Sequence, residues 1–292
     1  MQSSSAPNAS WLPKLVVAPS FLLGFFFIYG LIAWNGYLSL SASHLLPNYE
    51  FIGIGNYVDL FENDRFHVAL KNLGIFGVLF IGGSMAFGLL LAILLDQKIR
   101  AEGVLRTIYL YPMAISFIVT GTAWKWILNP GLGIEHLVQS WGFPNFQFDW
   151  LVDDKHAIYC IVIAGIWQAS GFVMALFLAG LRGIDDSIIK AAQIDGASLP
   201  RIYWRIVVPS LRPVFFSTLM VVSHLSIKSF DLVIALTSGG PGYSTDLPAT
   251  FMYAMSFSRG QVAMGAASAT IMLCMVAAIV VPYLYSELRT KK

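Results

Sequence analysis

Charge is scarce in this sequence of 292 residues: Asp, Glu, Lys and Arg make up 12% of it, whereas 57% of the residues are hydrophobic. Soluble globular domains carry about 25% charged residues, and the mean hydropathy of +0.70 excludes that class. Cysteine is nearly absent too, because Cys160 and Cys274 are the only two and both fall in long apolar runs. This excludes a disulfide framework. The composition therefore indicates a membrane protein.

Motifs for catalysis are also missing. The sequence has no G-x-x-x-x-G-K-[ST] phosphate loop, no H-E-x-x-H, no G-x-S-x-G elbow and no Cys/His spacing for a metal. We expect a chain that is not an enzyme and that holds no metal or cofactor of its own. The net charge of +2 is spread over positions that flank the apolar runs, so it does not indicate nucleic-acid binding.

Apolar runs of about 20 residues, the length that crosses ~30 Å of hydrocarbon as a helix, recur six times. They are continuously apolar rather than alternating, which is typical of helices and not of a membrane barrel. We expect one all-α transmembrane domain over residues 1–292, with a short mobile tail at residues 1–10. The six expected spans are Leu15–Leu40, Leu73–Leu95, Leu105–Leu128, Ala157–Leu181, Val214–Leu236 and Val262–Tyr285.

The Lys and Arg residues in the short loops predict the orientation of the spans. With the N-terminus in the cytoplasm, twelve of these cations fall on the cytoplasmic side and four fall outside. We therefore expect both termini in the cytoplasm. The aromatic run Trp141–Trp150 lies in an outside loop, where lipid headgroups or an external protein are both suitable neighbours.

A polar insertion, residues 184–209, separates the fourth and fifth runs. An aspartate at its start is a suitable N-cap for a short helix, and Gly196 can adopt the left-handed conformation that ends it. Ser198 can cap a second, amphipathic helix, which Pro209 is expected to stop. The pattern predicts a helix, a bend at glycine and a second helix.

Two interpretations fit this insertion. Ala191, Ala192 and Gly196 leave one surface flat enough for the backbone of another protein to approach, with Arg201 and Arg205 as a charged rim. A helix that lies on anionic headgroups would use the same basic residues. Composition alone favours neither.

Ionisable residues also occur inside the fifth run, where His224, Lys228 and Asp231 follow one another at helical spacing. A lone Lys at that depth costs about 2.5 to 3.5 kcal/mol, so it needs a partner or a water-filled cavity. Asp231 is the expected partner of Lys228. The pair either fixes helix packing or lines a translocation pathway.

The insertion resembles a family motif. Permease subunits of binding-protein-dependent ABC importers carry Glu-Ala-Ala, three residues, Gly, nine residues and Ile-x-Leu-Pro, and this chain matches at Ala191, Ala192, Gly196, Ile206 and Pro209. Lys190 stands in place of the family's Glu. The resemblance extends over the chain in LDQKIR, RTIYLYPMA, WKWILNPGLG, SGFVMALFLAGL, IKSFDLV, LTSGGPGYSTDLPATFMY and VPYLYSELRTKK. It is greatest to the first permease subunit of carbohydrate importers, above all those for glucose and mannose in Gram-negative bacteria.

The resemblance implies a six-helix, type I ABC importer permease in the inner membrane, with a coupling helix between helices 4 and 5. The implied partners are a second permease subunit, two ATPase subunits that bind ATP and Mg²⁺, a periplasmic sugar-binding protein and membrane lipid. The implied function is half of the pathway for a monosaccharide. The residues expected to couple to the ATPase are Lys190, Ala191, Ala192, Asp195, Gly196, Ala197, Ile206 and Pro209.

Sugars require planar hydrogen-bonding groups and aromatic faces. The polar and aromatic residues inside the predicted spans are therefore candidates for the pathway, although Ser and Thr often bond within helices and Trp often anchors at the interface. The family's recurring Phe-Asp pair favours a structural role for the aspartate. The candidates are Trp124, Trp167, Gln168, Ser170, His224, Lys228, Asp231, Ser268 and Thr270.

Two other classes compete with this interpretation. A secondary, ion-coupled transporter would use Asp231 and Lys228. Such folds usually contain internal inverted repeats and broken helices, but the two halves of this sequence show no similarity. An intramembrane hydrolase would need His224 or Lys228 as base, but no recognisable motif places a nucleophile beside them.

Overall fold

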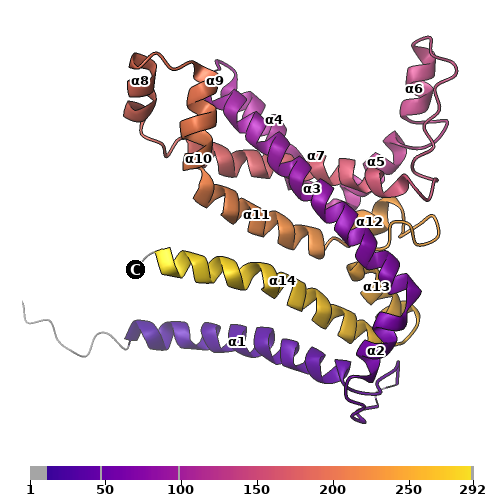
Figure 1. The fold of residues 1–292 in the computed structure, drawn as a ribbon. Coiled ribbons are helices and arrows are strands. Elements are labelled where there is room, and N and C mark those ends of the chain that lie inside the picture. The colour runs from indigo at the N-terminus through magenta and orange to yellow at the C-terminus, as the bar shows by residue number, and fades with distance from the viewer. Residues whose placement is uncertain (1–11, 47, 98, 291–292) are drawn as a thin grey trace, which may run out of the picture.

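The computed structural model describes residues 12–46, 48–97 and 99–290, which are almost entirely helical (Figure 1). These residues form no β-strand, only an isolated bridge between Ser41 and Phe51. The predicted all-α fold class is confirmed. The expected tail at residues 1–10 and three of the cations used for the orientation, Lys98, Lys291 and Lys292, lie outside the described residues.

The helices follow one another without any intervening sheet. In chain order they are α1 (Leu12–Ser39), α2 (Gly55–Glu62), α3 (Asp64–Asp96), α4 (Glu102–Ala114), α5 (Phe117–Ile127), α6 (Ile134–Ser140), α7 (Ala157–Leu181), α8 (Asp186–Ile194), α9 (Leu199–Ile202), a π-helical turn (Tyr203–Val207), α10 (Val208–Ser210), α11 (Arg212–Ile227), α12 (Asp231–Leu236), α13 (Pro248–Tyr253), a second π-helical turn (Ala254–Ser258) and α14 (Val262–Thr290).

Four of these helices, α1, α3, α7 and α14, are each long and apolar enough to cross a membrane. They match the first, second, fourth and sixth predicted spans. The third span is broken, because α4 and α5 meet at 100°. The helical segment Leu199–Ser210 and helix α11, which follows it, also meet at an angle, of 66°. Counting each bent pair as one span gives up to six spans within the part of the chain that the structure describes.

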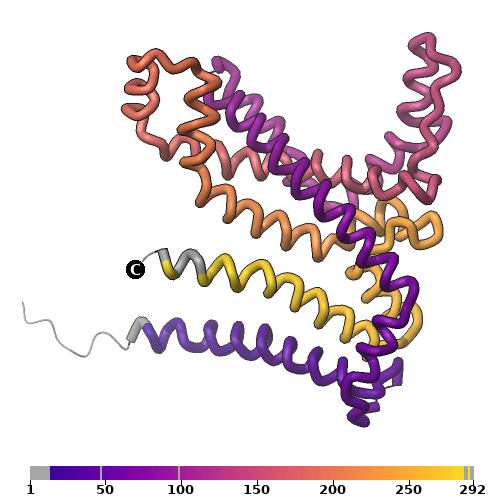
Figure 2. Tube along the Cα trace, in the orientation of Figure 1, coloured from indigo at the N-terminus to yellow at the C-terminus, as the bar shows by residue number. Residues whose placement is uncertain are grey.

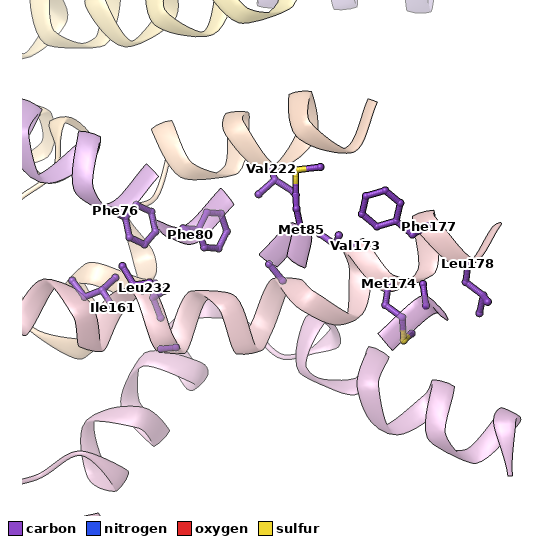
Figure 3. Packing of buried hydrophobic residues seen from close by; sticks show 14 of the residues in the cluster. Phe76, Phe80, Met85, Ile161, Val173, Met174, Phe177, Leu178, Val222 and Leu232 are labelled. Carbon is purple, nitrogen blue, oxygen red and sulfur yellow. The ribbon is translucent and has the colours of Figure 1, made fainter. Parts of the chain in front are cut away.

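The core lies where α3, α7 and α11 pack together. Figure 3 shows Phe76 and Phe80 of α3 beside Ile161 of α7, with Val222 of α11 above Met85. Helices in lipid associate through close packing rather than through the hydrophobic effect. Gly171 of α7 illustrates this, because a Cβ there would lie only 1.8 Å from the carbonyl oxygen of Tyr109 in α4.

Helices α1 and α14 lie side by side at one edge of the bundle (Figure 2). The Asn35 amide of α1 donates to the carbonyl oxygen of Ala266, at 3.2 Å, and to Oγ1 of Thr270, at 3.1 Å. The apolar window of α1 is otherwise exposed along its whole length. It therefore presents its surface to lipid or to a partner subunit.

A buried ion pair ties the loop after α12 to the start of α3. Nε of Arg65 donates to Oδ2 of Asp246 at 2.6 Å, and the Asp246 side chain is 1% exposed. The Arg65 guanidinium also lies over the Tyr243 ring, 4.4 Å from its centroid. The Asn72 amide donates to the carbonyl oxygens of Tyr243 and Asp246. These contacts hold the Gly-rich loop against α3.

Candidate functional site

The insertion, residues 184–210, folds as a helical hairpin, which we call the coupling hairpin. It projects from one end of the bundle, beside the end of α3 (Figure 1). Asp185 caps α8 as expected, because its carboxylate accepts from the Ser187 amide at 2.8 Å. That hydrogen bond holds the pKa of Asp185 below its ordinary value.

The bend at Gly196 is the one that the sequence predicts. Its φ of +78° is left-handed, a conformation that glycine adopts at little cost. The Gly196 amide donates to the carbonyl oxygen of Gln193, and the Ala197 amide donates to that of Ala192, both at 3.0 Å. These two bonds form a Schellman motif. The motif residues Gly196 and Ala197 thus set the angle between α8 and α9.

The second helix ends one residue beyond the predicted stop at Pro209. It continues through the π-helical turn to Ser210 and is then bent at Leu211. Proline has no N–H and its ring crowds the preceding turn. The wider π turn, in which the Val208 amide donates to the Tyr203 carbonyl, accommodates the proline without ending the helix.

The motif residues divide between two surfaces. Ala191 and Gly196 are exposed, as a docking surface requires, whereas Ala192 is buried beneath the hairpin. The expectation that Ala192 contributes to the outer surface is therefore wrong. Two other apolar side chains of the hairpin, which the sequence did not single out, are strongly exposed: Ile194 at 86% and Trp204 at 78%.

A second site lies beside two helix breaks, where α12 packs against α5. The first break separates α4 from α5 at Ile115 and Ser116, and Ser116 caps α5. The second separates α11 from α12 over residues 228–230. A pocket of about 140 Å³ lies between them, lined by Phe117, Leu225, Lys228, Ser229, Phe230, Asp231 and Leu232.

The second break corrects the prediction for the fifth span. Lys228 is the C-cap of α11 and Asp231 begins α12, so they do not lie on one continuous helix with His224. No ion pair joins Lys228 to Asp231 among the described residues, and the expected pairing is wrong. Asp231 stands instead at a helix N-terminus, where a negative charge is favourable. Both side chains are exposed and border the pocket.

Gln168 holds the first break together. Its amide donates to the carbonyl oxygen of Ile115 at 2.8 Å, which satisfies an acceptor that the end of α4 leaves free. The side chain is 3% exposed and does not line the pocket. Trp124 of α5 and Trp167 of α7 meet edge to face, with ring centroids 5.9 Å apart. Ser170 donates to the Trp167 carbonyl within α7.

The other candidates lie elsewhere. Ser268 is buried and donates to the carbonyl oxygen of Pro248 at 3.4 Å. Thr270 belongs to the contact between α1 and α14. His224 is exposed on α11, one turn before Lys228. The structure therefore brings Lys228 and Asp231 together at the pocket and gives Ser268 and Thr270 roles in helix packing.

Apolar helices that could cross a membrane, two of them broken near a pocket, are features of membrane transporters. Residues 84–290 match the family described as the binding-protein-dependent transport system inner membrane component. The chain belongs to this family. It is thus an inner-membrane permease component of a binding-protein-dependent transport system.

Several relatives match most of the chain. A probable ABC transporter permease protein of Pyrococcus horikoshii is 42% identical over 273 residues, covering 93% of this chain and 94% of the relative. The xylose/arabinose import permease protein XacH of Haloferax volcanii is 37% identical over 264 residues, with coverages of 89% and 83%. A bacterial ABC transporter involved in alginate import has the same fold, with a TM-score of 0.83 at 20% identity and coverages of 97% and 96%.

Proposed function

We propose that this chain is one of two permease subunits of an ATP-driven sugar importer. Its coupling hairpin lies in the cytoplasm and docks on an ATPase subunit that binds ATP and Mg²⁺. The chain forms half of the pathway for a sugar that a periplasmic binding protein delivers. Family membership together with the exposed, capped hairpin carries this proposal.

The physical support for docking is the exposed surface of the hairpin. Ile194, Leu199 and Trp204 present large apolar side chains to solvent at the end of the bundle. Exposed apolar side chains outside the membrane mark an interaction site where they lie together. A protein partner that covers Ile194 and Trp204 explains their exposure, and the bare Gly196 between the helices lets its backbone come close.

We place substrate contact at the pocket between the two helix breaks. Irregular backbone at membrane depth is tolerated where it is buried in protein or lines a water-filled cavity. The pocket offers the Lys228 ammonium, the Asp231 carboxylate and the Ser229 hydroxyl, which suit the hydroxyl groups of a sugar. The sister permease would supply the other wall.

We propose a monosaccharide, glucose or mannose first, as the substrate. A pentose is the second candidate, because the relative from Haloferax volcanii is named for xylose and arabinose import.

The test of the transporter class is ATP-driven uptake into vesicles that hold the full complex, with vanadate and a protonophore as inhibitors. Inhibition by vanadate alone supports an ATP-driven importer, whereas inhibition by the protonophore alone supports the ion-coupled alternative at Asp231 and Lys228.

A scan of binding-protein affinity identifies the sugar. Glucose, mannose, xylose and arabinose are titrated against the partner periplasmic protein, and uptake is then measured with the sugar that binds best. Tight binding of xylose with no binding of glucose overturns the hexose assignment and leaves the importer class intact.

A further inference from the structure

The hydroxyl of Tyr203 joins the coupling hairpin to the end of α3. It donates to Oδ2 of Asp96 at 3.0 Å and accepts from Nε2 of Gln97 at 2.7 Å. Asp96 is the last residue of α3 and Gln97 is its C-cap. The two partners therefore hold the Tyr203 hydroxyl from both its donor and its acceptor side.

This contact joins the hairpin to the end of a long helix of the core. Helix α3 is 33 residues long and packs along α7. Leu95, directly before Asp96, is 2% exposed and belongs to the core. A displacement of Tyr203 is therefore transmitted to a rigid element that reaches through the bundle.

The backbone at Tyr203 supports the same conclusion. Tyr203 begins the π-helical turn. Ile202, directly before the turn, and Val207, its last residue, are both 1% exposed. By contrast, α8 buries only Ala192. The hairpin is thus anchored through its second helix, and the Tyr203 hydroxyl is the polar part of that anchor.

The Tyr203 hydroxyl stays protonated at neutral pH. Burial, and then the neighbouring Asp96 carboxylate, raise the pKa of Tyr203 above its ordinary value. The hydroxyl therefore remains a donor to Asp96 at neutral pH.

We infer that Tyr203 is a positioning residue for the coupling step, which passes movement of the hairpin to α3 through Asp96 and Gln97. This rests on the proposed function. When an ATPase subunit moves the hairpin, the hydrogen bonds make α3 follow it. Without them, the hairpin moves against α3 and part of the ATP is hydrolysed without transport.

The test uses the complete transporter in proteoliposomes, with sister permease, ATPase and sugar-loaded binding protein. Tyr203→Phe removes one oxygen and keeps the ring. We expect normal assembly and basal ATP hydrolysis, together with a rise of threefold or more in ATP hydrolysed per sugar imported. Asp96→Ala, which removes the acceptor of the Tyr203 hydroxyl, should have the same effect, and the double variant should add little beyond either single change.

Tyr285→Phe is the matched control. Tyr285 lies on α14, is 68% exposed, and its hydroxyl has no hydrogen-bond partner within the described part of the chain. It should leave the ratio of ATP to sugar unchanged.

Several outcomes distinguish the two proposals. A wild-type ratio in Tyr203→Phe overturns the inference, and the proposed function survives if the wild-type complex still transports. A wild-type complex that imports no sugar with ATP overturns the proposed function itself. If Tyr203→Phe fails to assemble, Asp96→Ala, which removes the acceptor, decides, and a wild-type ratio in that assembled variant also overturns the inference.

Discussion

Gly196 allows the bend of the coupling hairpin and its docking surface to be tested separately. Its φ is +78°, and a Cβ built there meets no atom within 4 Å in this chain. Gly196→Ala therefore causes no clash, and its cost is the left-handed conformation, about 1 to 2 kcal/mol for an L-residue. That cost lowers the population of the bent hairpin by about 5- to 30-fold.

Gly196→Asn strains the bend less than Gly196→Ala does, but it adds more bulk to the docking surface. Asn tolerates the left-handed conformation better than other residues, so the bend survives while a larger side chain stands on the surface. Since no atom of this chain lies near that position, any steric effect must come from a partner. We expect Gly196→Asn to keep a folded hairpin and to lose most of the retained ATPase and of the uptake. Gly196→Val, which strains the bend and adds bulk, should abolish uptake with membrane insertion intact.

The assay is the amount of ATPase that copurifies with each variant, measured beside ATP-driven uptake. Gly103→Ala is the matched control, because Gly103 lies in α4 without positive φ and has no atom within 4 Å of a built Cβ. Wild-type retention in Gly196→Asn with a defect in Gly196→Ala means that only the bend matters. Wild-type behaviour of Gly196→Val refutes the docking hypothesis altogether.

Three further predictions concern the pocket, the energy source and the buried ion pair. Lys228→Met should lower uptake more than it lowers assembled complex, and adding Asp231→Leu should not change assembly, because no ion pair joins the two; wild-type uptake by the double variant rules out the pocket as the sugar site. The purified chain should not hydrolyse ATP, as an assay of released phosphate checks; activity beyond that of a mock preparation contradicts this. Arg65→Met should destabilise the chain by about 3 to 5 kcal/mol, since it leaves a buried charge unpaired, and Asp246→Leu should recover most of the loss; an unchanged melting temperature in Arg65→Met speaks against it.

Local chemistry explains what the sequence determined by itself. Apolar runs predict spans because every backbone polar group in lipid must be satisfied within the segment. The hairpin was equally readable, since the Asp185 cap and the Gly196 bend depend on neighbours within a few residues. The spacing from Ala191 to Pro209 also indicated the family to which the chain belongs.

Tertiary structure alone decided the helix breaks and the partners across helices. Helical spacing placed Lys228 beside Asp231, but the backbone leaves the helix between them. The first break is stabilised by Gln168, which is 53 residues away from Ile115 in the sequence. Burial of Ala192 likewise depends on what lies beneath the hairpin. Periodicity describes only the faces of one helix, whereas a break persists where another helix satisfies the backbone groups that it frees.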